Sequence, residues 1–562
     1  MPKELCVTTD YPDDALRAGR HYTKGDLDRM MAYVAALGVR RYQWVFDTIW
    51  SLYDENNPVG YDLLAEACEA AHRHGMRFDV QFKPFEDALQ GSVLPHTFPA
   101  PAGSCCMNHP SGLIHCLRPF LVEHPDMQMA RLPGTDEDPG GRIAELRLFK
   151  HDDGPAPFGA DDLTILSSSW NGGYRVYEGP VVFSETVEWR PGFPYTDEGK
   201  RVVTLGGLEL PDDTRFVVIR CNAGGSFFNA IERLVEMVND KGDVIPSMPG
   251  YGCPSREAAS QRYERICASA RLELTRYTRD PEVRERIFDR DRFLEEYQEM
   301  RRFPRHWEDV DLCQVDEVAV TRGKLPYATG HANPVYPEVR RYWLDQVKFC
   351  IDRNVDGVNI RPATHNRSYE PWVYGFNGPV VAQSRHPGHA EEARRINGEA
   401  FTQFLREARE LLRRNGKELG VHVLGLYFRH ADGAPNSTPF PRNIEWQWKT
   451  WVHELADYVE LQGAPKLRPE NIKEVTDRIG LAAREAGVPF IYRCSSRGRG
   501  HNLRFDGPYP TLEREVDYVQ RHPDVTEYNL YETAQFGRIN EKDEWEGSPD
   551  IADLVASRWW RR

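Results

Sequence analysis

The sequence predicts an α/β protein built on a closed (β/α)8 barrel, with a β-rich domain inserted between the third and fourth barrel strands. Two observations predict this architecture. Towards both ends of the chain, short apolar segments alternate with amphipathic helical segments, the pattern of βαβ units around a parallel sheet. Between residues 143 and 221 the apolar period changes to two, which is typical of half-buried antiparallel strands.

The first part of the predicted barrel covers residues 1–98 and supplies three strands, at residues 5–10, 42–47 and 77–83. Helical spacing separates them at residues 26–37 and 61–74. Each of these helices stops at a glycine, Gly38 and Gly75. Glycine is the favoured residue just beyond a helix end, because it adopts the left-handed backbone conformation without a steric penalty.

The insertion is expected at residues 99–250, followed by a charged helical segment or lid at residues 251–332. Residues 91–140 are rich in Pro, Gly, His and Cys and predict a long functional loop. Turn signals such as Asn171-Gly172-Gly173 separate the strands that follow. We therefore expect a small sandwich-like domain with strands at residues 143–149, 163–168, 174–177, 181–189, 201–205 and 216–221.

The remaining barrel strands are expected in residues 333–562, where the alternation of strand and helix resumes. Together with the first three they make eight, the number that closes such a barrel. The predicted strands lie at residues 357–361, 421–429, 458–462, 490–494 and 528–532, and the helices at residues 336–354, 391–414, 446–456, 469–486 and 509–522.

The bulk composition indicates a globular enzyme rather than a nucleic-acid or membrane protein. The net charge of -15 without a basic run argues against a nucleic-acid partner, and no apolar run reaches the roughly 20 residues that span a bilayer. The N-terminus has no signal-peptide core, and the 11 cysteines show no Cys-x-x-Cys spacing. We expect reduced thiols, a cytoplasmic location and no metal or other cofactor. The sequence leaves open whether the chain forms a homo-oligomer.

Three motifs carry a resemblance to a known family. They are His124-Pro125-Asp126, the segment from Asn333-Pro334 to Val339-Arg340, and Val355-Asp356-Gly357-Val358. In these segments the chain resembles the family-10-like glycosyl hydrolases. The resemblance covers the barrel half and implies a (β/α)8 fold and a carbohydrate substrate. It departs from the family at Arg361, because the family commonly has an acid after the Asp-Gly-Val strand.

Acidic residues at the carboxyl ends of the predicted strands are the catalytic candidates, since the active site of such a barrel lies there. Glycoside cleavage uses two carboxyl groups, one as acid and one as nucleophile or base. Glu460, Glu532 and Asp47 are the candidates for these roles. His365 is a candidate general acid or base, because a histidine titrates near neutral pH. Each acid can instead cap a helix or pair with an arginine.

Basic residues recur at the same strand ends, which favours an anionic substrate. Arginine binds carboxylate and sulfate groups through two parallel hydrogen bonds. The same residues can alternatively neutralise the buried acids of the barrel, and both roles can hold together. The substrate-binding candidates are Lys83, Arg361, Asn366, Tyr427, Arg429, His430, Gln462 and Arg493.

Three functions therefore stay open at the level of sequence. The first is a glycoside hydrolase acting on a uronate- or sulfate-bearing oligosaccharide. The second is a lyase, in which a His or Tyr removes the proton next to a carboxylate that an arginine neutralises. The third is a carbohydrate-binding protein on an enzyme scaffold that has lost its activity, which the arginine at position 361 motivates.

Overall fold

A computed structural model gives the fold of the chain and its side-chain contacts. It describes residues 3–18, 20–46, 53, 57, 59–90, 105–108, 114–135, 138–149, 153–169, 175–188, 199–221, 235–245, 247–248, 317–322, 326–362, 368–369, 373–425, 437–438, 443–462, 469–495, 512–531, 533, 536–540 and 542–557. These residues fall into two compact units, one around the barrel and one formed by residues 87–275 and 288–331.

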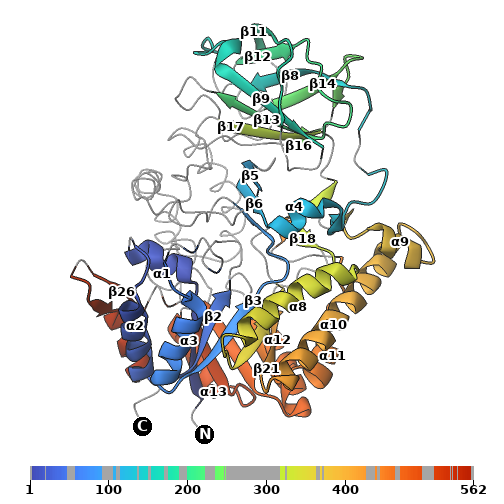
Figure 1. Cartoon of the computed structure of the whole chain (residues 1–562). Coiled ribbons are helices and arrows are strands. Elements are labelled where there is room, and N and C mark those ends of the chain that lie inside the picture. The colour runs from blue at the N-terminus through green and yellow to red at the C-terminus, as the bar shows by residue number, and fades with distance from the viewer. Residues whose placement is uncertain are drawn as a thin grey trace. The chain divides into compact units, whose positions relative to one another are not determined.

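The first unit is a closed barrel of eight parallel strands, as predicted (Figure 1). Each strand pairs in register with the next, and the last pairs with the first, so the sheet has no free edge. The pair of β3 and β19 spans the insertion. In order around the barrel the strands are β1 (Glu4–Thr9), β2 (Val39–Phe46), β3 (Arg77–Phe82), β19 (Gly357–Ile360), β21 (Glu418–Leu424), β23 (Tyr458–Gln462), β24 (Phe490–Ser495) and β25 (Glu527–Tyr531).

Amphipathic helices surround the barrel and bury their apolar sides against it (Figure 1). Thr23 and Asp26 form a capping box that starts α2, because each side chain bonds the other's backbone N–H group. No helix in the described part of the chain is long and apolar enough to cross a membrane. The main helices are α2 (Lys24–Ala36), α3 (Leu63–Arg73), α8 (Pro337–Ile351), α10 (Ala390–Arg414), α12 (Pro469–Ala486) and α13 (Leu512–Arg521).

The helix expected at residues 446–456 is shorter than predicted and changes its winding. A single turn, α11 (Trp448–Thr450), continues into a π-helical turn at Trp451–Leu455. The indole N–H of Trp451 donates to the hydroxyl of Thr402 at 2.8 Å. The wider turn therefore lies where a fully buried Trp side chain meets helix α10.

The second unit contains two five-stranded antiparallel sheets, which confirms the inserted β domain. Alternate apolar residues of both sheets form one buried cluster that includes Leu146, Ile165, Val217 and Met237. One sheet has the order β10 (Arg175–Val176), β9 (Leu163–Ser168), β13 (Phe216–Cys221), β17 (Glu317–Arg322), β16 (Ser247–Met248), and the other β11 (Val182–Glu188), β12 (Lys200–Gly206), β8 (Ile143–Phe149), β14 (Val235–Asn239), β15 (Val244–Ile245).

Two segments differ from the sequence expectation. The end of the segment expected to be a charged helical lid forms strands β17 and β18 (Tyr327–Ala332). Val318 and Val320 alternate there with Glu317 and Ala319. This stretch with a period of two is short, so it gives only a weak strand signal after the charged residues that precede it. The expected loop at residues 91–140 contains β5 (Cys105–Asn108), β6 (Ile114–Leu117), α4 (Pro119–Glu123) and β7 (Gln128–Ala130).

Glycine is required inside the barrel at Gly420, and this requirement predicts a stability effect. A Cβ atom at this position would lie closer than 3.0 Å to the ring of Tyr458. Overpacking of a buried site typically costs about 1–3 kcal/mol. We expect Gly420→Ala to lower the free energy of barrel unfolding by that amount, which urea denaturation shows as a lower midpoint. Gly378→Ala is the control, since nothing lies within 4 Å of its added Cβ; equal midpoints for the two variants would contradict the packing described here.

Candidate functional site

The interior of the barrel is filled with polar and charged side chains rather than branched apolar ones. Alternate residues of a strand point to the same face of the sheet, so every second residue of a barrel strand points into the barrel. In each strand the middle one of these inward-pointing residues is polar. These middle residues are all buried. They are Thr8, Gln43, Gln81, Asn359, His422, Glu460, Arg493 and Asn529.

Glu460 is the centre of this middle set and is fully buried. Its Oε2 accepts hydrogen bonds from the amides of Gln43 at 2.8 Å and Asn359 at 2.6 Å. Its Oε1 accepts one from the amide of Asn529 at 2.8 Å. The carboxylate of β23 is thereby connected to β2, β19 and β25. Two oxygens that both accept hydrogen bonds suit the ionised carboxylate, which has no proton to donate.

The ionisation of Glu460 reflects opposing influences. Burial raises the pKa of this carboxyl above its ordinary value, because a charge in a dry interior loses its hydration. The charges of Arg493 and Arg361 and the amide hydrogen bonds act in the opposite direction. A buried carboxyl with a raised pKa on which two guanidinium charges act is the kind of group that active sites contain.

Of the cations predicted from the sequence, Lys83 and Arg361 lie just beyond the carboxyl ends of β3 and β19, and Arg493 lies within β24. Lys83 forms an ion pair with Glu86 at 2.7 Å. Arg493 donates to the amide oxygen of Gln81 at 2.9 Å and lies over the ring of Tyr531, 3.9 Å from its centroid.

Arg361 has a different environment from the other two cations. It is only 8% exposed, and its Nη2 donates to Oε1 of Gln462 at 3.1 Å. Within the described parts of the chain its Nε has no hydrogen-bond partner and no carboxylate lies within 4.0 Å of the guanidinium. A buried cation whose contact is a neutral amide lacks the pairing that buried charges ordinarily have.

His422 was not predicted and belongs to the same group. It pairs in register with Glu460, and its Nδ1 lies 3.9 Å from Glu460 Oε1. Burial and the charges of Arg361 and Arg493 hold the pKa of His422 well below its ordinary value, against a smaller opposing effect of Gln462. The imidazole is therefore neutral at physiological pH, and among the described residues neither ring nitrogen has a well-aligned hydrogen bond.

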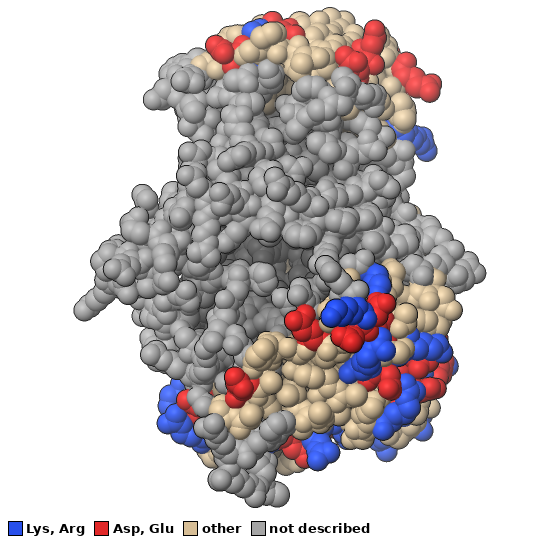
Figure 2. Space-filling view, turned by 90° about the vertical axis from the view of Figure 1, so that its left-hand side faces the viewer, with Lys and Arg blue, Asp and Glu red and all other residues tan. Residues whose placement is uncertain are grey.

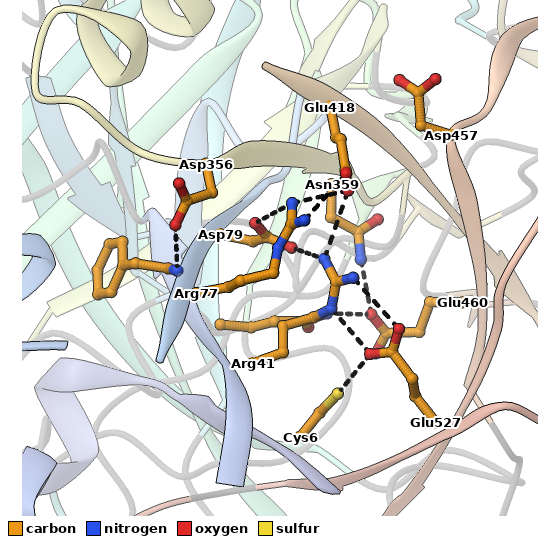
Figure 3. Close-up of polar contacts among 12 residues, drawn as sticks. Cys6, Arg41, Arg77, Asp79, Asp356, Asn359, Glu418, Asp457, Glu460 and Glu527 are labelled. Carbon is orange, nitrogen blue, oxygen red and sulfur yellow. Dashed lines mark hydrogen bonds and ion pairs between the residues drawn. The ribbon is translucent and has the colours of Figure 1, made fainter. Parts of the chain in front are cut away.

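A second charged group fills the barrel two residues earlier along the strands, towards their amino ends (Figure 3). Arg41 Nε donates to Glu527 at 2.8 Å, and another nitrogen of the same guanidinium pairs with Asp79. The thiol of Cys6 also contacts Glu527, at 3.0 Å. The guanidinium of Arg41 lies over the ring of Tyr458, 4.4 Å from its centroid. Each side chain here contacts an oppositely charged group, an aromatic ring or a hydrogen-bonding partner, so we assign this group to stability rather than to catalysis.

The structure brings together the predicted residues that it describes. Glu460 and Gln462 lie on β23, Arg361 contacts Gln462, and the charges of Arg361 and Arg493 act on Glu460. The charge of Lys83 acts on His422 in the same group. The other predicted site residues lie outside the described part of the chain: Asp47, His365, Asn366, Tyr427, Arg429, His430 and Glu532.

Sequence reasoning missed the amides and the histidine of the middle set. The available signal was the alternation of polar and apolar residues within strands that are buried on both faces. Asn359, for example, stands between Val358 and Ile360, and His422 between Val421 and Val423. A buried parallel strand ordinarily reads as a continuous apolar run. A polar residue at every second position therefore indicates a polar interior.

On the face of the barrel unit that Figure 2 shows, the described residues form no concentration of charge of one sign. In Figure 2 basic and acidic side chains intermingle over the visible described surface of the barrel unit. Ion pairs such as Arg395 with Glu399 at 2.6 Å account for part of this mixing. No group of three or more His, Cys, Asp or Glu residues in the described segments is arranged to hold a metal ion.

No family model and no curated protein matches the chain. Among solved structures it is similar to the β-amylase catalytic domain of Paenibacillus polymyxa (TM-score 0.33, 7% identity, 99% of this chain and 98% of that one). It is also similar to β-galactosidases of Marinomonas ef1 (0.38, 8%, 99% and 58%) and Halorubrum lacusprofundi (0.34, 11%, 99% and 57%).

The chain thus spans under two thirds of the length of both β-galactosidases. Structural similarity at these TM-scores supports no argument about chemistry. The assignment of a (β/α)8 barrel therefore rests on the order of its strands, and the description of the site rests on its side-chain contacts.

The neutral state of His422 predicts a pH dependence of stability. The unfolded chain binds a proton at this histidine below about pH 6.5, whereas the folded chain does not. Stability is then fully present above that pH and falls by about 1.4 kcal/mol per pH unit as pH drops towards the folded pKa. We expect His422→Gln to remove this slope. Urea unfolding of both proteins between pH 8 and 5 measures the difference; parallel curves would show that the folded imidazole titrates normally.

Proposed function

We propose that the protein is a glycoside hydrolase-type enzyme that acts on an acidic, uronate- or sulfate-bearing oligosaccharide at the carboxyl end of the barrel. The observation that carries this proposal is the environment of Arg361. Its buried guanidinium has an amide partner, free hydrogen-bonding capacity and no carboxylate within 4.0 Å among the described residues. The carboxyl ends of the strands are where barrels of this class place their active sites.

An anionic group on the ligand would satisfy this cation. A guanidinium presents five N–H donors in a plane and binds a carboxylate or sulfate through two of them. One N–H group of Arg361 donates a hydrogen bond to Gln462. The position of Gln462 is in turn set by the register of β23 with β24. Lys83, by contrast, already has Glu86 as its anion. Arg361 is therefore the cation that we assign to the acidic group of the substrate.

In this proposal Glu460 acts in its ionised form, as nucleophile or base. Its two oxygens accept three amide hydrogen bonds, and the charges of Arg493 and Arg361 favour the anion. Retaining and inverting glycosidases both need a second carboxyl group as acid. We assign that role to Glu532 or Asp47, with His365 as a further proton carrier. The remaining substrate contacts are assigned to Asn366, Tyr427, Arg429, His430, Gln462 and Arg493.

A lyase is the second candidate, and His422 favours it. Elimination from a uronate needs a cation beside the carboxylate and a neutral base for the adjacent proton. The structure has a neutral imidazole in the same group as Arg361. The products separate the two reactions, because elimination leaves an unsaturated sugar that absorbs in the ultraviolet and hydrolysis does not. Binding without turnover would instead support a carbohydrate-binding protein.

Replacement of Glu460 tests the catalytic assignment. Glu460→Gln keeps the size of the side chain and removes its charge, so we expect kcat on uronic-acid oligosaccharides to fall at least about 100-fold, as for loss of a general base. Glu527→Gln is the matched control, since it removes a buried carboxylate from the other charged group of the barrel. It should lower stability, with kcat per folded molecule retained. Reducing-end release measures turnover, and unchanged kcat in Glu460→Gln would remove the assignment.

Replacement of Arg361 tests the acidic substrate. A hydrogen bond between charged partners contributes about 1.5–3 kcal/mol, so Arg361→Gln should lower kcat/KM for a uronic-acid oligosaccharide about 10- to 150-fold. The neutral analogue of the same linkage should lose less than about threefold. Arg77→Gln is the control, because Arg77 is partly exposed and pairs with Glu418 at 2.7 Å. Equal losses on acidic and neutral substrates would count against an acidic ligand.

A further inference from the structure

The hydrogen bonds of Glu460 leave one position on its carboxylate open. A carboxylate has about four lone-pair sites, two on each oxygen. Oε2 accepts hydrogen bonds from Gln43 at 2.8 Å and from Asn359 at 2.6 Å, which occupies both of its sites. The contact with Asn359 is drawn in Figure 3. Oε1 accepts one hydrogen bond, from Asn529 at 2.8 Å. Among the described residues, one site on Oε1 therefore has no donor.

His422 lies beside this oxygen on the neighbouring strand. It pairs in register with Glu460, and its Nδ1 is 3.9 Å from Oε1. This distance is too long for a direct hydrogen bond, and a water molecule commonly bridges polar groups that are more than about 3.5 Å apart. Both side chains are fully buried, and within the described chain neither ring nitrogen of His422 has a well-aligned hydrogen bond. The two groups together therefore suit a single bound water.

A sugar carbon is too large to use the same site. Direct attack by a carboxylate requires the anomeric carbon to lie about 3–3.5 Å from the attacking oxygen. That carbon also carries the ring oxygen, a second ring carbon and the leaving group, which all need room at the same point. The imidazole of His422 lies 3.9 Å from Oε1 and is fully buried. Glu460 is therefore better placed to act through a water molecule than to bond to the sugar itself.

We propose that Glu460 and His422 hold the water molecule that attacks the sugar, so that hydrolysis inverts the configuration at the anomeric carbon. The water donates one hydrogen bond to Oε1 of Glu460 and the other to Nδ1 of the neutral imidazole. As the water oxygen bonds to the anomeric carbon, the bond to the leaving oxygen breaks. Glu460 takes a proton from the water, and the general acid gives a proton to the leaving oxygen. This inference rests on the proposed hydrolase function.

The surroundings of both residues suit these roles. Amide donors from three other strands fix the orientation of the Glu460 carboxylate. Burial raises the pKa of Glu460, and a raised pKa makes a carboxylate a stronger base near neutral pH. The pKa of His422 is held well below its ordinary value by burial and by the charges of Arg361 and Arg493. A neutral imidazole has one nitrogen that accepts a hydrogen bond, which an imidazolium lacks.

The configuration of the first product tests the inference. Proton NMR follows the anomeric signals while the full-length wild-type enzyme hydrolyses a uronic-acid oligosaccharide with one type of anomeric linkage. We expect the first free sugar to have the opposite configuration to the substrate, which then changes slowly by mutarotation. A first product with the substrate's configuration would overturn the inference and leave the proposed hydrolase function standing. An unsaturated product, or no turnover, would overturn the proposed function and this inference with it.

The mass of the intact protein gives a second readout. A fluorine atom beside the anomeric carbon slows the hydrolysis of a glycosyl-enzyme, so an activated fluoro-uronide leaves its sugar on an enzyme that reacts through a covalent intermediate. We expect the mass of the wild-type chain to stay unchanged after incubation with this compound. A sugar adduct on Glu460, or on any other carboxylate, would show direct attack and contradict the bound water.

Two substitutions of His422 test its part in the step. His422→Phe cannot bond to the water, so we expect kcat to fall about 3- to 10-fold, as for the loss of one hydrogen bond, with KM unchanged. His422→Gln keeps a hydrogen-bonding side chain and should recover most of kcat. Glu527→Gln is the control and should retain kcat per folded molecule, because Glu527 belongs to the other charged group. Wild-type kcat in His422→Phe would refute the assigned water site; if this variant does not fold, the product configuration and the protein mass still decide.

Discussion

The pairing of buried charge is the constraint on which the rest of this structure depends. A carboxylate or guanidinium that loses its hydration is tolerated only when partners replace the water. Glu460 meets this requirement by accepting amide hydrogens from three other strands, at distances of 2.6–2.8 Å. The same contacts hold distant parts of the chain together, because their donors lie at positions 43, 359 and 529. One carboxylate thus links barrel geometry and site electrostatics.

The two charged groups inside the barrel differ in how completely they are neutralised. Near the amino ends of the strands, Arg41 of β2 contacts two carboxylates, Asp79 on β3 and Glu527 on β25, and an aromatic ring as well. In the group further along the strands, Arg361 has an amide in place of a carboxylate. Breaking a pair of the first kind is expected to cost stability. A cation that is incompletely neutralised, such as Arg361, can bind an anion from outside the chain. For this reason the proposed function is assigned to the carboxyl end of the barrel alone.

The sequence was sufficient for the barrel but not for the contacts within it. All eight strands follow from short apolar segments separated by helical periods, since this rhythm is a local property. The grouping of Arg361 with Gln462 follows from the rule that parallel strand ends converge. That Gln43, and not another side chain, bonds Glu460 depends on the stagger of the closed sheet, which no local pattern encodes. The strands of residues 317–332 were missed for a related reason, because their partners β13 and β7 lie far away in the sequence.

The neighbours β3 and β19 have a consequence for how the chain is made. Residues 83–356, which include the whole second unit, are synthesised between them. At translation speeds of about 5–20 residues per second, this interval lasts roughly 15–55 s. Throughout it β3 has no partner on one side, and an unpaired strand edge invites association with other chains. A nascent barrel of this design therefore has an unpaired edge at β3 until β19 has been synthesised.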